Sequence, residues 1–166
     1  MISIRPLIPT DWEDVRRIYL EGIATRQATF ETEAPAWEEW DAKHLQFARL
    51  VAESQDRTRL GWAALSAVSS RRVYSGVAEV SVYVAEKSRK RGIGRILLQR
   101  LIEESEAHGI WTLQAGIFPE NVASVRTHVS CGFRVVGTRE RIAKLDGNWR
   151  DTLILERRSS LPKFQT

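Results

Sequence analysis

In the middle of the chain, the spacing of apolar side chains changes from every second residue to the spacing of a helix. The alternation of Val80, Val82 and Val84 with polar neighbours predicts a β-strand, because β-branched side chains suit a pleated surface. From residue 93 onward the spacing is helical, and the residues expected to share one helix face are Ile93, Ile96, Leu97, Leu101 and Ile102. Gly109 is placed to end this helix. The pattern therefore predicts a strand, a short turn and an amphipathic helix.

The same two patterns predict the other elements. Further strands are expected at residues 2–4, 50–53, 60–68, 111–117, 133–138 and 151–156. A helix is expected to begin at Thr10, because Thr10 and Glu13 have the spacing of a capping box. Two more helices are expected near Pro35, which suits a first helical turn, and near Asn121. This order predicts an α/β fold in which helices flank both faces of a mixed sheet.

The composition is that of a globular protein. The chain has 166 residues, of which 43% are hydrophobic and 28% are charged, so it is long enough to bury a sizeable core. We expect one domain over residues 1–158 and a frayed tail over residues 159–166. No apolar run approaches the roughly 20 residues that cross a bilayer, and the single Cys131 has no partner for an internal disulfide. A cytoplasmic location without a membrane partner is therefore expected.

The charge distribution narrows the choice of ligand. The 25 basic and 21 acidic residues give a net charge of +4 and are interspersed along the chain. The densest basic cluster lies at residues 89–95. The only other dense cluster lies around Arg157 and Arg158. Local clusters suit a local polyanion better than a DNA-tracking stripe, so no nucleic-acid partner is expected.

This basic cluster forms the turn between the predicted strand and helix. Gly92 and Gly94 lack Cβ atoms, so a ligand can approach the backbone N–H groups there closely. Unpaired N–H groups and the helix dipole favour an anion at a helix start, and Arg89, Lys90 and Arg91 add positive charge. The turn lacks the third glycine of a dinucleotide fingerprint and the Gly-Lys-Ser/Thr of a P-loop. It predicts a pyrophosphate site, although these residues alone fit a solvated basic turn equally well.

The context of the turn indicates a family. Arg-x-x-Gly-x-Gly between a Val-x-Val-Tyr-Val strand and an amphipathic helix resembles the acetyl-CoA site of the GNAT N-acetyltransferases. Four further motifs are similar to the phosphinothricin acetyltransferase branch: Phe-Glu-Thr-Glu at 30–33, Arg-x-x-Tyr at 71–74, Glu-Val-Ser-Val-Tyr-Val at 79–84 and Ser-Val-Arg-Thr-His at 124–128. The resemblance covers roughly residues 2–157. It implies a mostly antiparallel twisted sheet in which strands 80–84 and 112–117 splay apart at one end.

The resemblance also implies the cofactor contacts. Acetyl-CoA would lie in the splay as a co-substrate, with its pantetheine arm bonded to the backbone of the central strand. The residues implied to bind it are Val82, Tyr83, Val84, Arg89, Lys90, Arg91, Gly92, Ile93, Gly94, Arg95 and Asn121. For Asn121, a helix N-cap is a strong alternative. No metal site is expected.

Two residues are candidates for the chemistry. Acetyl transfer needs a neutral amine, but an aliphatic amine is mostly protonated at pH 7, so a base must take its proton. The resemblance implies this role for Glu79, the only acidic residue of its strand, whereas the residue alone suits a strand-edge glutamate paired to an arginine. It implies proton transfer for His128 too, although a helix histidine that packs or caps is the alternative. His108 is expected to cap its own helix.

The acceptor site is also implied by the resemblance. Arg71 and Tyr74 match positions that hold the substrate in the phosphinothricin branch, Phe30 matches an aromatic wall, and Tyr83 completes the pocket. An arginine can grip an α-carboxylate with two hydrogen bonds, which favours a small amino acid. Ser69 stands where phosphinothricin enzymes tend to have a second cation, so methionine sulfone and methionine sulfoximine are equally good candidates.

The leading hypothesis is a homodimeric, acetyl-CoA-dependent N-acetyltransferase that acts on the α-amine of a small amino acid. The dimer follows from the resemblance alone. One alternative is an acetyltransferase for protein N-termini or polyamines, and a polyamine is disfavoured by the basic loop at Arg71 and Arg72. Another is a non-catalytic acyl-CoA sensor, which the presence of both Glu79 and His128 disfavours.

Overall fold

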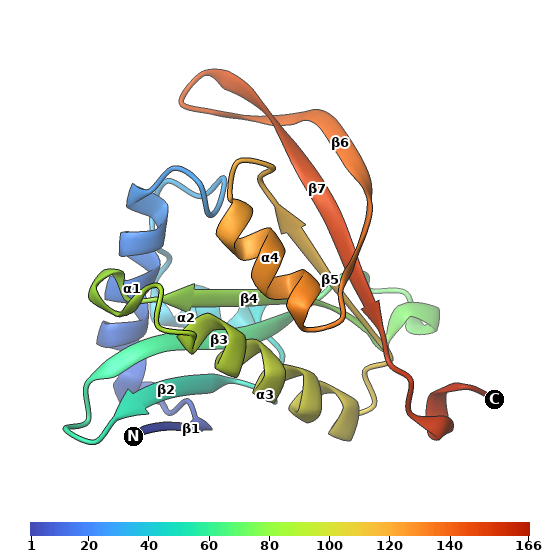
Figure 1. Ribbon diagram of the computed structural model, residues 1–166, viewed down its shortest axis with the longest axis horizontal. Coiled ribbons are helices and arrows are strands. Elements are labelled where there is room, and N and C mark those ends of the chain that lie inside the picture. The colour runs from blue at the N-terminus through green and yellow to red at the C-terminus, as the bar shows by residue number, and fades with distance from the viewer.

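The computed structural model describes residues 1–166 as one seven-stranded sheet covered by helices on both faces (Figure 1). The strands are β1 (Ile2–Pro6), β2 (Leu50–Ser54), β3 (Arg59–Ala67), β4 (Val77–Val84), β5 (Thr112–Ile117), β6 (Arg134–Leu145) and β7 (Asn148–Arg158). Their spatial order is β1-β2-β3-β4-β5-β7-β6. Only β4 and β5 pair in parallel. The predicted mixed, mostly antiparallel α/β fold is therefore confirmed.

Four α-helices pack on this sheet, and none of them has the length and apolar character that a membrane span requires. They are α1 (Trp12–Ala24), α2 (Trp37–Lys43), α3 (Ile93–Ala107) and α4 (Val122–Ser130). Short 3-10 turns lie at Pro9–Asp11, Arg72–Tyr74, Glu86–Ser88 and Pro162–Phe164. Figure 1 shows α3 and α4 in front of the sheet and the β6–β7 hairpin projecting from the body.

The sheet separates two hydrophobic clusters, because successive side chains of a strand point to opposite faces. On β3, Ala63 and Leu65 belong to the larger cluster with α3, whereas Trp62 and Ala64 belong to the smaller cluster with α1 and α2. Val80 of β4 is in the larger cluster. Val82 and Val84 pack against the same cluster, so the predicted alternation of β4 is confirmed.

Two details of the predicted helices are wrong. Ile96 of α3 is 41% exposed, and Leu98 is fully buried in its place. The buried face of α3 is therefore set by its packing on the sheet, and it differs from the face that the apolar spacing predicts. Thr10 does not cap α1, because the chain passes through the Pro9–Asp11 turn first and Asp11 occupies the N-cap position.

The last two strands and the tail also differ from expectation. The strands expected at 133–138 and 151–156 are parts of a longer hairpin, whose polar outer residues hid its extent. After β7 the chain folds back instead of fraying: Ser159 Oγ donates to Glu106 Oε1 at 2.7 Å, and Lys163 Nζ donates to Glu106 O at 2.7 Å. Phe164 lies edge-on to Trp111, with ring centroids 6.5 Å apart.

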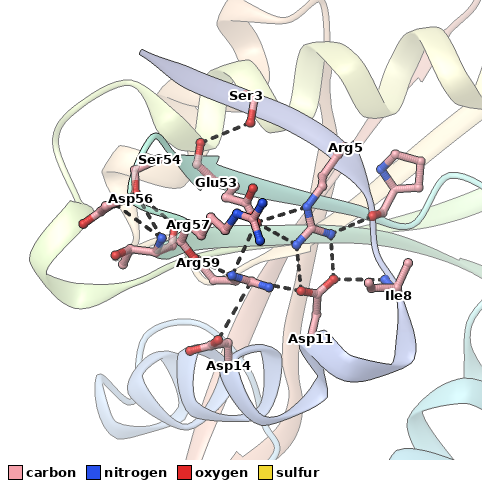
Figure 2. Close-up of polar contacts among 12 residues, drawn as sticks. Ser3, Arg5, Ile8, Asp11, Asp14, Glu53, Ser54, Asp56, Arg57 and Arg59 are labelled. Carbon is pink, nitrogen blue, oxygen red and sulfur yellow. Dashed lines mark hydrogen bonds and ion pairs between the residues drawn. The ribbon is translucent and has the colours of Figure 1, made fainter.

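A buried carboxylate joins the N-terminal strand to α1 and β3 (Figure 2). Asp11 is fully buried and accepts two hydrogen bonds from Arg5, each 2.8 Å long. Arg59 Nε donates to Asp11 Oδ1 at 2.9 Å, and the Ile8 N–H donates to Asp11 Oδ2 at 3.0 Å. Arg5 also reaches Glu53 on β2, with Nη2 and Oε2 2.8 Å apart. This network links three strands to the start of α1.

The network sets the charge of Asp11. Burial alone would raise the pKa of Asp11, but hydrogen bonds from Arg5, the Ile8 N–H and Arg59 outweigh it and lower the pKa from 3.8 to about 2. A carboxyl whose pKa falls on folding stabilises the protein above its unfolded-state pKa, here by roughly 2 kcal/mol. That contribution is lost as the pH falls from about 4 toward 2.

We predict that Asp11→Asn lowers the free energy of unfolding by about 3 kcal/mol, because it leaves two arginines without their buried partner. Urea unfolding at pH 7 measures the change. Asp14→Asn is the matched control, since Asp14 lies in the first turn of α1 and is 42% exposed. It pairs with the exposed Arg17 at 3.0 Å and approaches Arg59 only to 4.0 Å. Its change is expected within about 0.5 kcal/mol. Equal losses in the two variants would contradict this account.

Candidate active site

The centre of the sheet opens where β4 and β5 diverge. The two strands pair only over Val77–Glu79 and Thr112–Gln114. Beyond this point β4 continues along β3 as far as Val84, and β5 continues along β7 as far as Ile117. The facing backbone edges of β4 and β5 therefore have no strand partner there, which is the splay implied by the resemblance.

A cavity of about 430 Å³ lies at this opening. Its walls come from the α1–α2 loop, β4, the segment from β5 to α4, and the β6–β7 hairpin. Six of the predicted site residues line it: Phe30, Glu79, Val82, Tyr83, Asn121 and His128. Residues from both halves of the chain thus meet at one site.

Glu79 belongs to the last residue pair before the strands diverge. Its register partner is Gln114 of β5, whose Nε2 donates a hydrogen bond to Glu79 Oε2 at 3.0 Å. The carboxylate thus has an amide partner instead of the arginine that the alternative reading supposed. A hydrogen-bonded but unneutralised carboxylate at the cavity wall is able to accept a proton.

His128 lies on α4 and is 7% exposed. Its Nδ1 is 2.8 Å from the Ser124 carbonyl oxygen. Because a carbonyl can only accept, Nδ1 carries the hydrogen, and in the neutral ring Nε2 keeps a lone pair. Burial lowers the pKa of His128 below 6.5, although the bond to Ser124 opposes this. The imidazole is therefore neutral at pH 7, with Nε2 as its acceptor atom.

Tyr83 lies on the α1 side of the sheet. Its ring stacks on Trp62 and meets Tyr19 edge-on, with both centroid distances 4.9 Å. Gly22 of α1 leaves room for it, since a Cβ at Gly22 would lie 2.7 Å from the Tyr83 ring. Burial raises the pKa of Tyr83, so its hydroxyl stays neutral. Tyr83 shapes the cavity wall without adding charge.

The start of α3 has the features expected of an anion site. Gly92 is the N-cap, with φ of +78°, a conformation that favours glycine. No side chain caps the helix, and its first backbone hydrogen bond runs from the Ile96 N–H to the Gly92 carbonyl oxygen. A Cβ at Gly94 would meet only Val84, at 3.5 Å. The first N–H groups of α3 are thus left for a ligand.

The basic residues of this turn divide into two groups. Arg89 folds toward α1, where its Nη2 donates to the Glu21 carbonyl oxygen at 3.2 Å. Lys90, Arg91 and Arg95 are exposed. Three cations therefore remain at the helix start, and Arg89 fixes the turn to α1.

Asn121 has two contacts within the protein. Its Oδ1 accepts from the Ser124 N–H at 3.3 Å, which makes it the N-cap of α4. Its Nδ2 donates to the Gln27 carbonyl oxygen in the α1–α2 loop at 3.1 Å. The N-cap alternative is confirmed, and contact with the cofactor stays a prediction.

The predicted acceptor residues do not all meet. Phe30 lines the cavity and meets Phe118 edge-on, with centroids 4.9 Å apart. Arg71 and Tyr74 are exposed on the loop before β4, where the Arg71 guanidinium lies 5.4 Å from the Tyr74 ring centroid. Neither of them lines the cavity of its own chain. Their acceptor role stays a prediction.

Sequence reasoning missed Arg150, which holds the cavity walls together. Its guanidinium donates to the Arg26 carbonyl oxygen and to Gln27 Oε1, each at 3.0 Å, and pairs with Glu120 at 3.3 Å. It also lies 4.1 Å from the Phe118 ring centroid. Arg150 thus joins the β6–β7 hairpin, the α1–α2 loop and the β5–α4 turn.

One partner of a cavity residue and two residues of the cavity lining were missed as well. Gln114 would be found from the β4–β5 register, because it is paired with Glu79. Lys43 and Arg139 line the cavity from the end of α2 and from β6. Neither belongs to a motif, so no local signal marks them. Nowhere do three His, Cys, Asp or Glu side chains lie close enough to hold a metal ion.

Comparison with known proteins gives consistent matches. The model of the acetyltransferase (GNAT) family matches residues 11–133. YwnH of Bacillus subtilis is 35% identical over 154 residues, which cover 90% of this chain and 94% of YwnH. The L-methionine sulfoximine/L-methionine sulfone acetyltransferase of Pseudomonas paraeruginosa is 30% identical over 162 residues, covering 93% and 92% of the two chains.

A solved structure extends this likeness to the cofactor. The GNAT superfamily phosphinothricin acetyltransferase from Sinorhizobium meliloti, in complex with acetyl-CoA, has a TM-score of 0.86 and 26% identity, covering 95% of this chain and 88% of its own. The uncapped start of α3 and the unpaired edge of β4 suit the pyrophosphate and pantetheine of that ligand. The chain therefore belongs to the acetyltransferase (GNAT) family, and it is an acetyl-CoA-dependent N-acetyltransferase.

Proposed function

We propose that the protein acetylates the α-amine of a small amino acid such as methionine sulfoximine, methionine sulfone or phosphinothricin. The observation that carries the proposal is the meeting of Glu79 and His128 in one cavity where β4 and β5 diverge. The acceptor class is supported by the names of the Pseudomonas and Sinorhizobium relatives. Phe30 and Phe118 add an apolar wall for a short side chain.

Glu79 is proposed as the base that removes a proton from the incoming ammonium group, directly or through water. The amine is mostly protonated at pH 7, so this step must come before attack. Gln114 acts through Glu79, because its hydrogen bond holds one carboxylate oxygen and leaves the other available. Proton transfer by a positioned carboxylate typically contributes about 100- to 10,000-fold to the rate.

His128 is proposed as the second proton carrier. Because its Nδ1–H is held by the Ser124 carbonyl, only Nε2 can gain or lose a proton. The neutral ring must first accept a proton, and it then becomes an acid that is strong for an imidazole, since burial disfavours its charge. It can pass that proton to the departing thiolate.

The bond changes fit direct transfer. Acetyl-CoA supplies the thioester: the amine nitrogen bonds to the carbonyl carbon, the carbon–sulfur bond breaks, and CoA leaves as a thiolate that takes up a proton. Backbone N–H groups on the unpaired edge of β4 would stabilise the oxyanion. Cys131 does not line the cavity, so no cysteine is placed there to carry the acetyl group.

Cofactor binding is proposed to divide between two elements. The first N–H groups of α3, at Ile93 and Gly94, would hold the pyrophosphate with help from Lys90, Arg91 and Arg95. Val82 and Val84 on β4 would offer backbone groups to the pantetheine. A homodimer and a cytoplasmic location stay predictions.

We predict that the purified protein releases CoA thiol from acetyl-CoA with methionine sulfone, methionine sulfoximine or phosphinothricin, but not with spermidine or a short peptide. The physical reason is the cavity lining, which combines apolar residues with two carboxylates and two cations, and so suits the ammonium, the carboxylate and the short side chain of a small amino acid. A colorimetric thiol assay measures the rates. Turnover with spermidine or the peptide alone would replace the proposal by one of the alternative acceptors.

We predict that Glu79→Gln lowers kcat by about 100-fold or more while the Kd of acetyl-CoA stays the same, because the amide cannot accept the proton. Steady-state kinetics and calorimetric titration measure the two quantities. Glu103→Gln on the exposed side of α3 makes the same chemical change and is expected to be neutral. Full turnover in Glu79→Gln would remove Glu79 from the mechanism.

We predict that His128→Asn lowers kcat/KM by about 10- to 100-fold at pH 7. It should also remove part of the fall in kcat/KM toward acidic pH, the acid limb of the pH profile. Since the pKa of His128 is lowered, its neutral form is present at pH 6.5 and above and is lost as the pH falls through the lowered value. Rates between pH 5 and 8 measure the limb.

His108→Asn is the control for this profile. The exposed His108 makes the same type of bond, with Nδ1 2.8 Å from the Glu104 carbonyl oxygen four residues earlier, but lies outside the cavity. Its profile is expected to match that of the unchanged protein. An acid limb that persists in His128→Asn would assign the limb to Glu79 instead.

A further inference from the structure

The β6 strand is irregular beside the cavity. Arg139 pairs with Thr152, and regular pairing resumes only at Ala143 opposite Arg150. Four residue steps on β6 therefore match two on β7, so the intervening segment bulges out of the ladder. Bulges of this kind often redirect a side chain next to an active site.

The register turns Arg139 toward the cavity. Directly paired residues on neighbouring strands present their side chains on the same face of the sheet. Thr152, the partner of Arg139, is buried and lines the cavity. Arg139 lines it too. The Arg139 side chain therefore lines the cavity, and it belongs to β6, the strand that carries the bulge.

The guanidinium of Arg139 has no partner in the protein, unlike that of Arg150. The Arg150 guanidinium donates hydrogen bonds to the Arg26 carbonyl oxygen, Gln27 and Glu120. Arg139 makes no hydrogen bond or ion pair with another side chain, although Asp151 lies next to its partner, because Asp151 is held by the Arg141 N–H at 2.8 Å. Arg139 is exposed, so its five donors face water and are available to a ligand.

The charges that line the cavity complement a zwitterion. Two carboxylates, Glu31 and Glu79, and two cations, Lys43 and Arg139, are the only ionised side chains of the lining at pH 7. None of the four is in an ion pair with another. An acceptor with an ammonium and a carboxylate on one carbon satisfies both signs, whereas a polyamine leaves the cations unpaired.

We propose that Arg139 binds the α-carboxylate of the acceptor amino acid. The inference rests on the proposed function and deepens it. It assigns binding of the α-carboxylate to a residue that lines the cavity of the same chain, which Arg71 does not. A planar guanidinium matches a carboxylate with two parallel hydrogen bonds, which the Lys43 ammonium does not. Arg139 therefore selects acceptors that keep a free carboxylate and sets the direction in which their amine faces Glu79.

The test compares each variant on two acceptors, methionine sulfone and its α-carboxamide, which keep the same amine and side chain. We expect Arg139→Gln to lower kcat/KM for methionine sulfone by about 10- to 100-fold relative to the unchanged protein, mainly through KM. For the carboxamide the same substitution should change kcat/KM by less than about threefold. Arg139→Lys should recover part of the loss, since it restores charge but not the planar fork.

Arg141→Gln is the matched control, because Arg141 lies on the same bulge and its side chain does not line the cavity. Equal losses of Arg139→Gln on both acceptors, or a selective loss in Lys43→Gln or Arg71→Gln instead, would overturn the inference while leaving the proposed function intact. An unchanged protein that acetylates neither acceptor but acetylates a peptide or spermidine would overturn both. The melting temperature of Arg139→Gln should be unchanged, since no protein contact is lost.

Discussion

The early end of the pairing between β4 and β5 is the constraint on which the site depends. A parallel pair normally continues along the strands, because unpaired backbone groups inside a protein are costly. Here each strand keeps its outer partner while the inner edges separate after three residue pairs. The separated edges supply hydrogen-bonding groups that the fold itself leaves unused, and the last pair before the separation carries Glu79 and Gln114. Backbone donors and the candidate base are therefore fixed by the same feature.

The charged residues divide into those that hold the structure and those that have no partner within the protein. Asp11 with Arg5 and Arg59 fixes β1, β3 and α1, and Arg150 fixes three segments around the cavity. In contrast, Lys90, Arg91 and Arg95 at α3 and Arg139 in the cavity lack such partners. When the segments around unpaired charges are held rigidly, the charges are preorganised for a ligand. The ligand can then pair with them without a rearrangement of the protein. Whether an arginine stabilises the structure or stays unpaired is therefore decided by its position in the fold.

Much of the fold follows from local pattern. The alternation on β4, the helical face of α3 and the glycine at its start predict a strand–turn–helix unit, and the structure has that unit. The misses have physical causes as well. Thr10 had the spacing of a cap, but the buried ion pairs of Asp11 determine where α1 begins. The β6–β7 hairpin was underestimated because both of its strands carry polar residues over most of their length, and polar strands give no apolar alternation.

The sequence by itself determined the fold class, the glycine turn at the start of α3 as a candidate anion site and, through the motifs, the candidates Glu79 and His128. These depend on residues close together in the chain, whose spacing is read directly. Only the tertiary structure decided that Gln114 holds Glu79, that Arg150 joins the cavity walls, that Arg139 rather than Arg71 lines the cavity, and that Nε2 is the free atom of His128. Such contacts join residues far apart in sequence or depend on burial and strand register, and local spacing carries no information about them.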